Sequence, residues 1–190
     1  MEFGLVLFLL TIPVLNVVDL AYYAFTWMQT QNAAQMGAQA AFSNCNTSNS
    51  LPAATICSQS YSANNLTLYD VVYQGVQESA LNNSVTLAGS KVSDGYYCSS
   101  SSNVLTQVGT IGYAYADNDT IGASVNGSNL APTETANTTC SGYGYADSLA
   151  NPGEYVTVNV SHTYTSVFPG MTVVALLPAT MTATAYARLD

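Results

Sequence analysis

Few side chains in this sequence have the types and spacing that catalysis or metal binding requires. His162 is the only histidine, and it lies in an alternating apolar and polar segment, which favours a structural role in a strand. The sequence contains no serine nucleophile motif, phosphate-binding glycine loop or zinc-protease motif. Asp117 and Asp119 are a weak Ca²⁺ candidate, because alternating oxygen ligands suit a hard cation, but the rest of such a pattern is absent. We therefore predict that the chain is not an enzyme and needs no metal or cofactor.

The four cysteines predict two disulfides. Cys45, Cys57, Cys98 and Cys140 form an even set in a chain that resembles an exported protein. Four cysteines allow three pairings. We favour Cys45–Cys57, which closes a short loop, and Cys98–Cys140, which spans a Gly- and Ser-rich stretch. Free thiols or a zinc site are the alternatives, but the single histidine and the lack of a Cys-x-x-Cys spacing disfavour zinc.

The charge composition excludes several classes of partner. Only 7% of the 190 residues are charged, against about 25% in ordinary soluble domains. Lys91 and Arg188 are the only basic side chains, and the net charge is -9. Binding to nucleic acid or to anionic lipid needs clustered Lys and Arg, so neither is expected. Sparse charge with many Ser, Thr, Asn and Tyr residues is typical of secreted and cell-surface proteins.

Asn-x-Ser/Thr sequons mark candidate N-glycosylation sites, which matter only in an organism with the machinery to use them. Seven are present, beginning at Asn46, Asn65, Asn82, Asn118, Asn126, Asn137 and Asn159.

An unbroken apolar run, residues 3–18, lies between Glu2 and Asp19. Three interpretations compete. A signal peptide needs a basic leader and a small-residue cleavage site, and neither is present. A plain membrane anchor would be short, because the run gives about 24 Å of helix against a bilayer core of about 30 Å. Extending the anchor takes Asp19 into the apolar layer, which costs a few kcal/mol. The third interpretation is a helix that leaves the membrane and packs against copies of itself.

No Lys or Arg precedes the apolar run, although orientation in the membrane normally relies on one. We infer that a basic leader was removed and that this numbering describes a processed form.

Residues 26–42 continue the helix with a different composition. Ala34, Gly37, Ala38 and Ala41 fall on one face at helical spacing, and such small residues allow close helix approach. This face is expected to pack either on the chain's own body or on another subunit. In the apolar half, Pro13 removes one backbone donor and should kink or loosen the helix.

Both ends of the chain resemble the TadE/TadG-like pilin family, the tight-adherence branch of type IV pilin-like proteins. The N-terminal likeness rests on residues 2–10, 17–20 and 31–41, with an acid at Glu2, a second at Asp19 and the run Asn32-Ala-Ala-Gln-Met-Gly-Ala-Gln-Ala-Ala41. The tail is also similar, through residues 156–161, 163–165, 168–170, 177–178, 181–185 and 188–189.

The resemblance implies a structural pilin-like subunit that polymerises through its N-terminal helix into an extracellular filament for adhesion or surface colonisation. It implies a homo-oligomer, passage through the cytoplasmic membrane, and contact with pilus assembly machinery. A membrane-anchored minor pilin of that machinery is the alternative. The assembly residues that we assign are Glu2, Asp19, Phe3, Leu7, Leu10, Pro13, Ala34, Gly37, Ala38 and Ala41.

The family often has a basic residue after the second acid, whereas Leu20 follows Asp19 here. We hypothesise that Asp19 or Glu2 pairs with the N-terminal amine of an adjacent subunit, or that Asp19 is protonated.

The sequence pattern of residues 43–190 predicts an α+β fold, in which a small antiparallel sheet packs on the long helix. We divide the chain into the helix, residues 1–42, and a surface domain, residues 43–190, with a loop-rich insertion at about 99–153. Periodicity predicts a second helix over residues 68–81. The strands that we expect are residues 84–88, 91–98, 155–167, 171–177 and 180–189.

Overall fold

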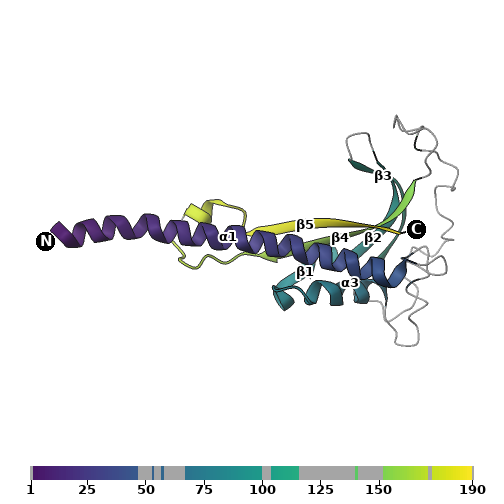
Figure 1. Cartoon of the computed structure of the whole chain (residues 1–190), viewed down its shortest axis with the longest axis horizontal. Coiled ribbons are helices and arrows are strands. Elements are labelled where there is room, and N and C mark those ends of the chain that lie inside the picture. The colour runs from purple at the N-terminus through teal and green to yellow at the C-terminus, as the bar shows by residue number, and fades with distance from the viewer. Residues whose placement is uncertain are drawn as a thin grey trace.

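The predicted α+β architecture is confirmed in a computed structural model, which describes residues 2–46, 53, 57, 67–99, 104–115, 140, 152–170 and 173–189. A long helix runs the length of the molecule, and a twisted antiparallel sheet lies against its C-terminal half (Figure 1). The helix extends beyond the sheet at its N-terminal end, so the molecule has a narrow end and a broad end (Figure 1).

Helix α1 spans Glu2–Cys45 and continues through Pro13. Its body-facing side is a stripe of buried residues at helical spacing, beginning at Asp19 and ending at Cys45. The stripe contains two buried threonines whose hydroxyls donate to carbonyls four residues earlier: Thr26 to Tyr22 at 2.8 Å and Thr30 to Thr26 at 2.9 Å. Because these bonds satisfy the hydroxyls locally, the stripe can be buried against a largely apolar body.

The sheet has five strands built around β4, Gly153–Thr163. β4 pairs along its length with β5, Thr180–Leu189, and near its two ends with β1, Val85–Leu87, and β2, Lys91–Ser99. β2 also pairs with β3, Leu105–Tyr115. Alternation along β4 directs Val156, Val158 and Val160 toward the helices, where all three are fully buried.

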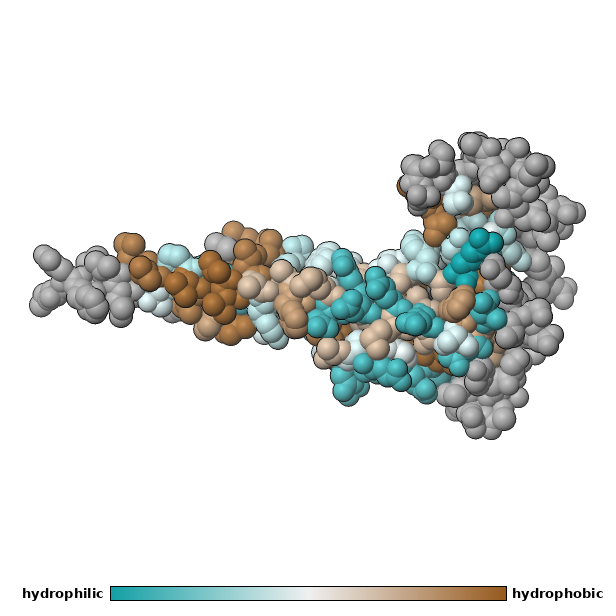
Figure 2. Space-filling model, viewed as in Figure 1, coloured by the Kyte–Doolittle hydropathy of each residue, from teal (hydrophilic) through white to brown (hydrophobic). Residues whose placement is uncertain are grey.

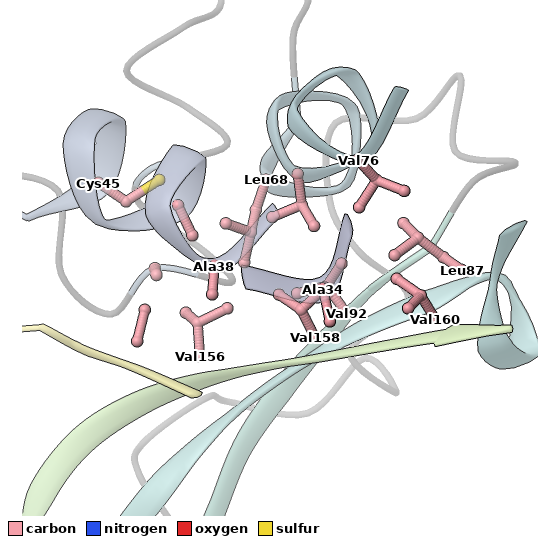
Figure 3. Packing of buried hydrophobic residues seen from close by; sticks show 14 of the residues in the cluster. Ala34, Ala38, Cys45, Leu68, Val76, Leu87, Val92, Val156, Val158 and Val160 are labelled. Atoms are coloured by element: carbon pink, nitrogen blue, oxygen red, sulfur yellow. The ribbon is translucent and has the colours of Figure 1, made fainter. Parts of the chain in front are cut away.

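The core lies between this face of the sheet, α1 and the second helix α3, Leu68–Gln77 (Figure 3). The two helices approach closely at glycines. A Cβ added at Gly75 would lie 2.6 Å from the Cβ of Ala40, and one added at Gly37 would lie 2.7 Å from a methyl of Val76. A larger residue at either position would push the helices apart.

Local signals position α3. Thr67 is its N-cap: the Thr67 side chain accepts from the Asp70 amide, while the Asp70 carboxylate accepts from the Thr67 amide at 2.7 Å. This reciprocal capping box fixes the start of the helix. The predicted helix 68–81 ends earlier, at Gln77, and 3₁₀ turns follow at Asn82–Ser84 (η3) and Ala88–Ser90 (η4) on either side of β1.

Both favoured disulfides are present. Cys45–Cys57 ties the end of α1 to the segment that follows it, and Cys98–Cys140 ties the end of β2 to a point 42 residues further along the chain. All four cysteines are buried.

Two strand predictions need correction. Residues 173–176 form a 3₁₀ helix, η6, Val173–Leu176, instead of a strand, because this segment packs against α1, where none of the described strands pairs with it. β4 ends at Thr163, because the chain then turns toward Asp19. The region predicted to be a loop-rich insertion, residues 99–153, contains one described strand between β2 and β4, namely β3.

Candidate functional site

The N-terminal part of α1, residues 2–18, stands free of the body, and we call it the stalk (Figure 1). Its side chains are described from Leu9 onward, and its large apolar side chains are widely exposed: 68% for Leu9, 62% for Leu10 and 67% for Val17. On the face that Figure 2 shows, the described part of the stalk is mostly apolar. The exposed apolar side chains Leu9, Leu10, Ile12, Val14, Val17 and Val18 are spread around the helix at about 100° per residue. A helix that is apolar all round is normally buried in a membrane or among other helices.

Asp19 lies where the stalk meets the body, and it is completely buried. Its carboxylate accepts three hydrogen bonds from one C-terminal segment: from the Tyr164 hydroxyl at 2.8 Å, the Ser166 hydroxyl at 2.6 Å and the Val167 amide at 2.9 Å. The Tyr164 hydroxyl also lies 3.2 Å from the Asp19 carbonyl oxygen. All three donors are neutral groups. They compensate the carboxylate for the water that it loses on burial.

The donors belong to the β4–β5 connection, a name that we use for residues 164–170 and 173–179. Aromatic packing holds this connection on α1, because the ring of Tyr164 meets that of Tyr23 edge-on at 5.1 Å and that of Tyr22 at 5.9 Å. Tyr164 also packs with Val174 and Met181 in a small second core. Further along, the Tyr23 hydroxyl donates to the Pro178 carbonyl at 3.3 Å.

The electrostatics favour a neutral tyrosine beside the acid. Burial raises the pKa of the Tyr164 hydroxyl, and the hydrogen bond to Asp19 raises it further. The hydroxyl therefore keeps its proton throughout the physiological range and remains a donor to Asp19.

A second buried acid lies at the opposite end of the sheet. The Glu154 carboxylate accepts from the Ala53 amide at 2.9 Å, and its side chain is hydrogen-bonded to that of Asp94, which is fully buried. Burial raises the pKa of Glu154 above its usual 4.5, although its hydrogen bonds oppose the shift. The raised pKa favours the neutral form of the Glu154 carboxyl group beside Asp94.

This pair links the Cys45–Cys57 loop to the sheet, because Ala53 lies between those two cysteines in the sequence. The sequence carries no motif that brings Asp94 and Glu154 together. Only the antiparallel register, in which Tyr96 faces Glu154 and Asp94 faces Val156, makes them diagonal neighbours on one face.

The predicted assembly residues fall into two groups. Leu10 and Pro13 lie exposed on the stalk, while Glu2, Phe3 and Leu7 lie in its helical backbone, and their side chains are outside the described ones. The second group packs on the chain's own body, which decides between the alternatives left open for that face; it contains Ala34, Gly37, Ala38 and Ala41. Asp19 lies on α1 between the two groups, at the base of the stalk.

The other candidates are scattered. Asn82 is exposed in a turn, Asn46 follows α1, and the Asn159 side chain accepts from the Thr184 hydroxyl on β5. His162 lies 2.9 Å from the Ser84 carbonyl, a contact that ties β4 to the start of β1. The remaining candidates fall outside the described residues: Asn65, Asn118, Asn126, Asn137, Asp117 and Asp119. Among the residues that the structure does describe, no three His, Cys, Asp or Glu side chains cluster as metal ligands.

Comparison with known proteins gives no match to a protein-family model, to a curated protein or to a solved structure. The likeness to TadE/TadG-like pilins therefore rests on the sequence residues alone.

Within the described part of the chain, α1 is the one helix long and apolar enough to cross a membrane. A signal sequence or the core helix of a soluble protein passes the same test of length and composition. In α1, however, the apolar part lies exposed. The helix thus indicates a membrane anchor or a signal sequence, and the two disulfides indicate an extracellular location for the body.

Proposed function

We propose that this chain is a pilin-like structural subunit. In this proposal the stalk sits in the cytoplasmic membrane before assembly, and in the core of an extracellular filament afterwards. The body coats the filament surface, where it serves adhesion or surface colonisation.

The observation that carries the proposal is the stalk, whose described side chains, from Leu9 to Val18, are mostly apolar and left exposed by the body. Its exposed large apolar side chains include Leu9, Leu10, Ile12, Val14, Val17 and Val18. At about 1.5–3 kcal/mol per buried side chain, removing them from water would release about 10 kcal/mol or more. The stalk therefore needs either lipid or other helices around it.

When the stalk moves from the membrane into a filament, neighbouring stalks replace lipid around it. This move gives no large hydrophobic gain in free energy, because lipid tails are as apolar as leucine. Close packing and polar contacts between subunits must then favour the filament. The connection of the stalk to the body supports this step, because α1 is one continuous helix that carries both the stalk and the stripe packed on the body.

The test is recovery of the chain in filaments sheared from native cells. Leu10→Gln removes one exposed stalk side chain, and Val104→Gln is the matched control, because Val104 is 57% exposed on the body and Leu10 is 62% exposed. Leu10→Gln removes the packing of one leucine between stalks and buries an amide in the filament core, so we expect its sheared yield to fall by roughly tenfold, while the control stays at the wild-type level. Equal yields of the two variants would contradict the proposal. A wild-type chain found only in the membrane fraction would favour the minor-pilin alternative.

A further inference from the structure

The β4–β5 connection exposes apolar side chains beside the base of the stalk. Leu176, at the end of η6, is 85% exposed, and Val167 and Leu177 are 49% and 37% exposed. In Figure 1, η6 and the chain leading to it lie alongside the middle of α1, at the end of the body from which the stalk emerges. Surface connections usually present polar side chains to water, so this group of exposed apolar residues requires a reason.

The surface around the stalk base is also uncharged. Between Glu154 and Arg188 the sequence contains no Asp, Glu, Lys or Arg, and between Glu2 and Asp70 the only such residue is Asp19. Asp19 is buried, and the connection itself donates to its carboxylate. The connection therefore covers Asp19, the acid at the base of the stalk, and also presents apolar side chains to the outside.

The length of the stalk sets where a membrane would end. Residues 2–18 make about 26 Å of helix, which is a few ångströms less than the hydrocarbon core of about 30 Å. A bilayer that accommodates the whole stalk would therefore reach the level of Asp19 and of the connection. Tyr22 is 49% exposed there, and tyrosine is a residue that favours the membrane–water interface.

We propose that the β4–β5 connection is a membrane-seating surface. Val167, Leu176 and Leu177 enter the boundary between headgroups and acyl chains of the bilayer that holds the stalk. Asp19 stays shielded behind them, which removes the cost of bringing a carboxylate to that depth. This inference rests on the membrane stage of the proposed function, and the partner that it names is the lipid bilayer, not a second copy of the chain.

Depth-dependent fluorescence quenching tests the surface. Trp27 is the only tryptophan, so Trp27→Phe gives a background in which each reporter is unique. The full chain is reconstituted in phosphatidylcholine vesicles with bromine either near the headgroups or near the chain ends. Leu176→Trp reports on the connection, Leu10→Trp on the stalk and Tyr73→Trp, on α3, on the body. Leu176 is highly exposed, so its replacement leaves packing intact.

If the connection seats on the membrane, bromine near the headgroups should quench the fluorescence of Leu176→Trp about twofold, since interfacial side chains lie about 5–10 Å deep. Leu10→Trp should be quenched more by bromine near the chain ends, and Tyr73→Trp by neither. If Leu10→Trp is quenched and Leu176→Trp is not, the connection does not enter the membrane and the inference is wrong, while the proposed function is unaffected. If Leu10→Trp is not quenched either, the membrane stage of the proposed function fails as well. The inference is also wrong if the Leu176→Trp side chain is covered by a second copy of the chain and not by lipid.

Discussion

The amide of Val167 donates to the carboxylate of Asp19 at 2.9 Å across 148 positions of sequence. This contact joins the last buried position of α1 before the stalk to the chain that has just left β4. It accounts for an acid within a long, largely apolar helix: Asp19 attaches the helix, at the base of the stalk, to the β4–β5 connection.

Removal of the Asp19 carboxylate should loosen the base of the stalk. Asp19→Ala leaves the Tyr164 and Ser166 hydroxyls and the Val167 amide without their acceptor. Hydrogen bonds to a charged group contribute about 1.5–3 kcal/mol each and are not additive, so we expect a loss of about 3 kcal/mol in the free energy of unfolding. Chemical denaturation of the full chain in detergent measures it. Gln31→Ala, on an exposed position of the same helix, is the control and should change little. Equal stability of the two variants would contradict the role of Asp19.

A side chain at Gly75 should separate the two helices. The new Cβ would meet the Ala40 Cβ at 2.6 Å and the Met36 carbonyl oxygen at 3.0 Å, and neither can rotate away. We expect Gly75→Ala to lose about 2 kcal/mol from overpacking, of which the better helix propensity of alanine restores about 1 kcal/mol. Thermal unfolding compares it with Gln74→Ala, on the exposed face of α3. A Gly75→Ala protein more stable than wild type would show that the close approach is not required.

The Asp94–Glu154 pair should make the protein less stable as the pH rises. Because the pKa of Glu154 is raised above 4.5 in the folded protein, the native state holds a proton that the unfolded chain releases. Above pH 4.5 the free energy of unfolding should therefore fall, by at most about 1.4 kcal/mol per pH unit for one proton, until the pH passes the raised pKa.

Glu154→Gln should flatten this dependence, since an amide is neutral at every pH and its oxygen can still accept from the Ala53 amide. Denaturation midpoints between pH 4 and pH 8 measure the slope, and Glu78→Gln, an exposed carboxylate on the body, is the matched control. If Glu154→Gln keeps the wild-type dependence of stability on pH, the proton responsible is bound by another group.

The two disulfides should differ in what they contribute. Cys45–Cys57 closes a loop of 12 residues and Cys98–Cys140 one of 42. Chain entropy alone gives about 3 kcal/mol for the shorter loop and about 4 kcal/mol for the longer. Unfolding of the double alanine variants of each pair measures the losses. Removal of Cys45–Cys57 should also weaken the hydrogen bond from Ala53 to Glu154, and an unchanged pH dependence in that variant would show that the two features are independent.

Local signals in the sequence are strong enough to predict much of the fold. The apolar run and the Ala-rich segment indicate one long helix, the alternation at residues 156–162 indicates the central strand, and cysteine spacing favours the observed pairs. Each of these depends on neighbours along the chain. The buried stripe on α1 was predictable as well, although its partner was not: helical spacing shows which residues share a face and not what covers that face.

The attachment site could not be predicted, because it depends on tertiary contacts between distant segments. No local pattern in the sequence indicates that Tyr164, Ser166 and Val167 donate to Asp19. Pairing of Asp19 or Glu2 with the N-terminal amine of an adjacent subunit, or protonation of Asp19, stays a prediction. Asp94 and Glu154 likewise meet only through strand register. The segment 171–177 misled for a related reason: its β-branched residues favour a strand, yet residues 173–176 form a 3₁₀ helix against α1.

Cryo-electron microscopy of material sheared from native cells, with the protein identified by mass spectrometry, tests the central claim most directly. The account predicts a helical filament with this chain as its repeating unit, stalks packed together in the core, and Asp19 bonded to residues 164–167 of the same subunit. Filaments built from a different protein, with this chain confined to the membrane fraction, would contradict it.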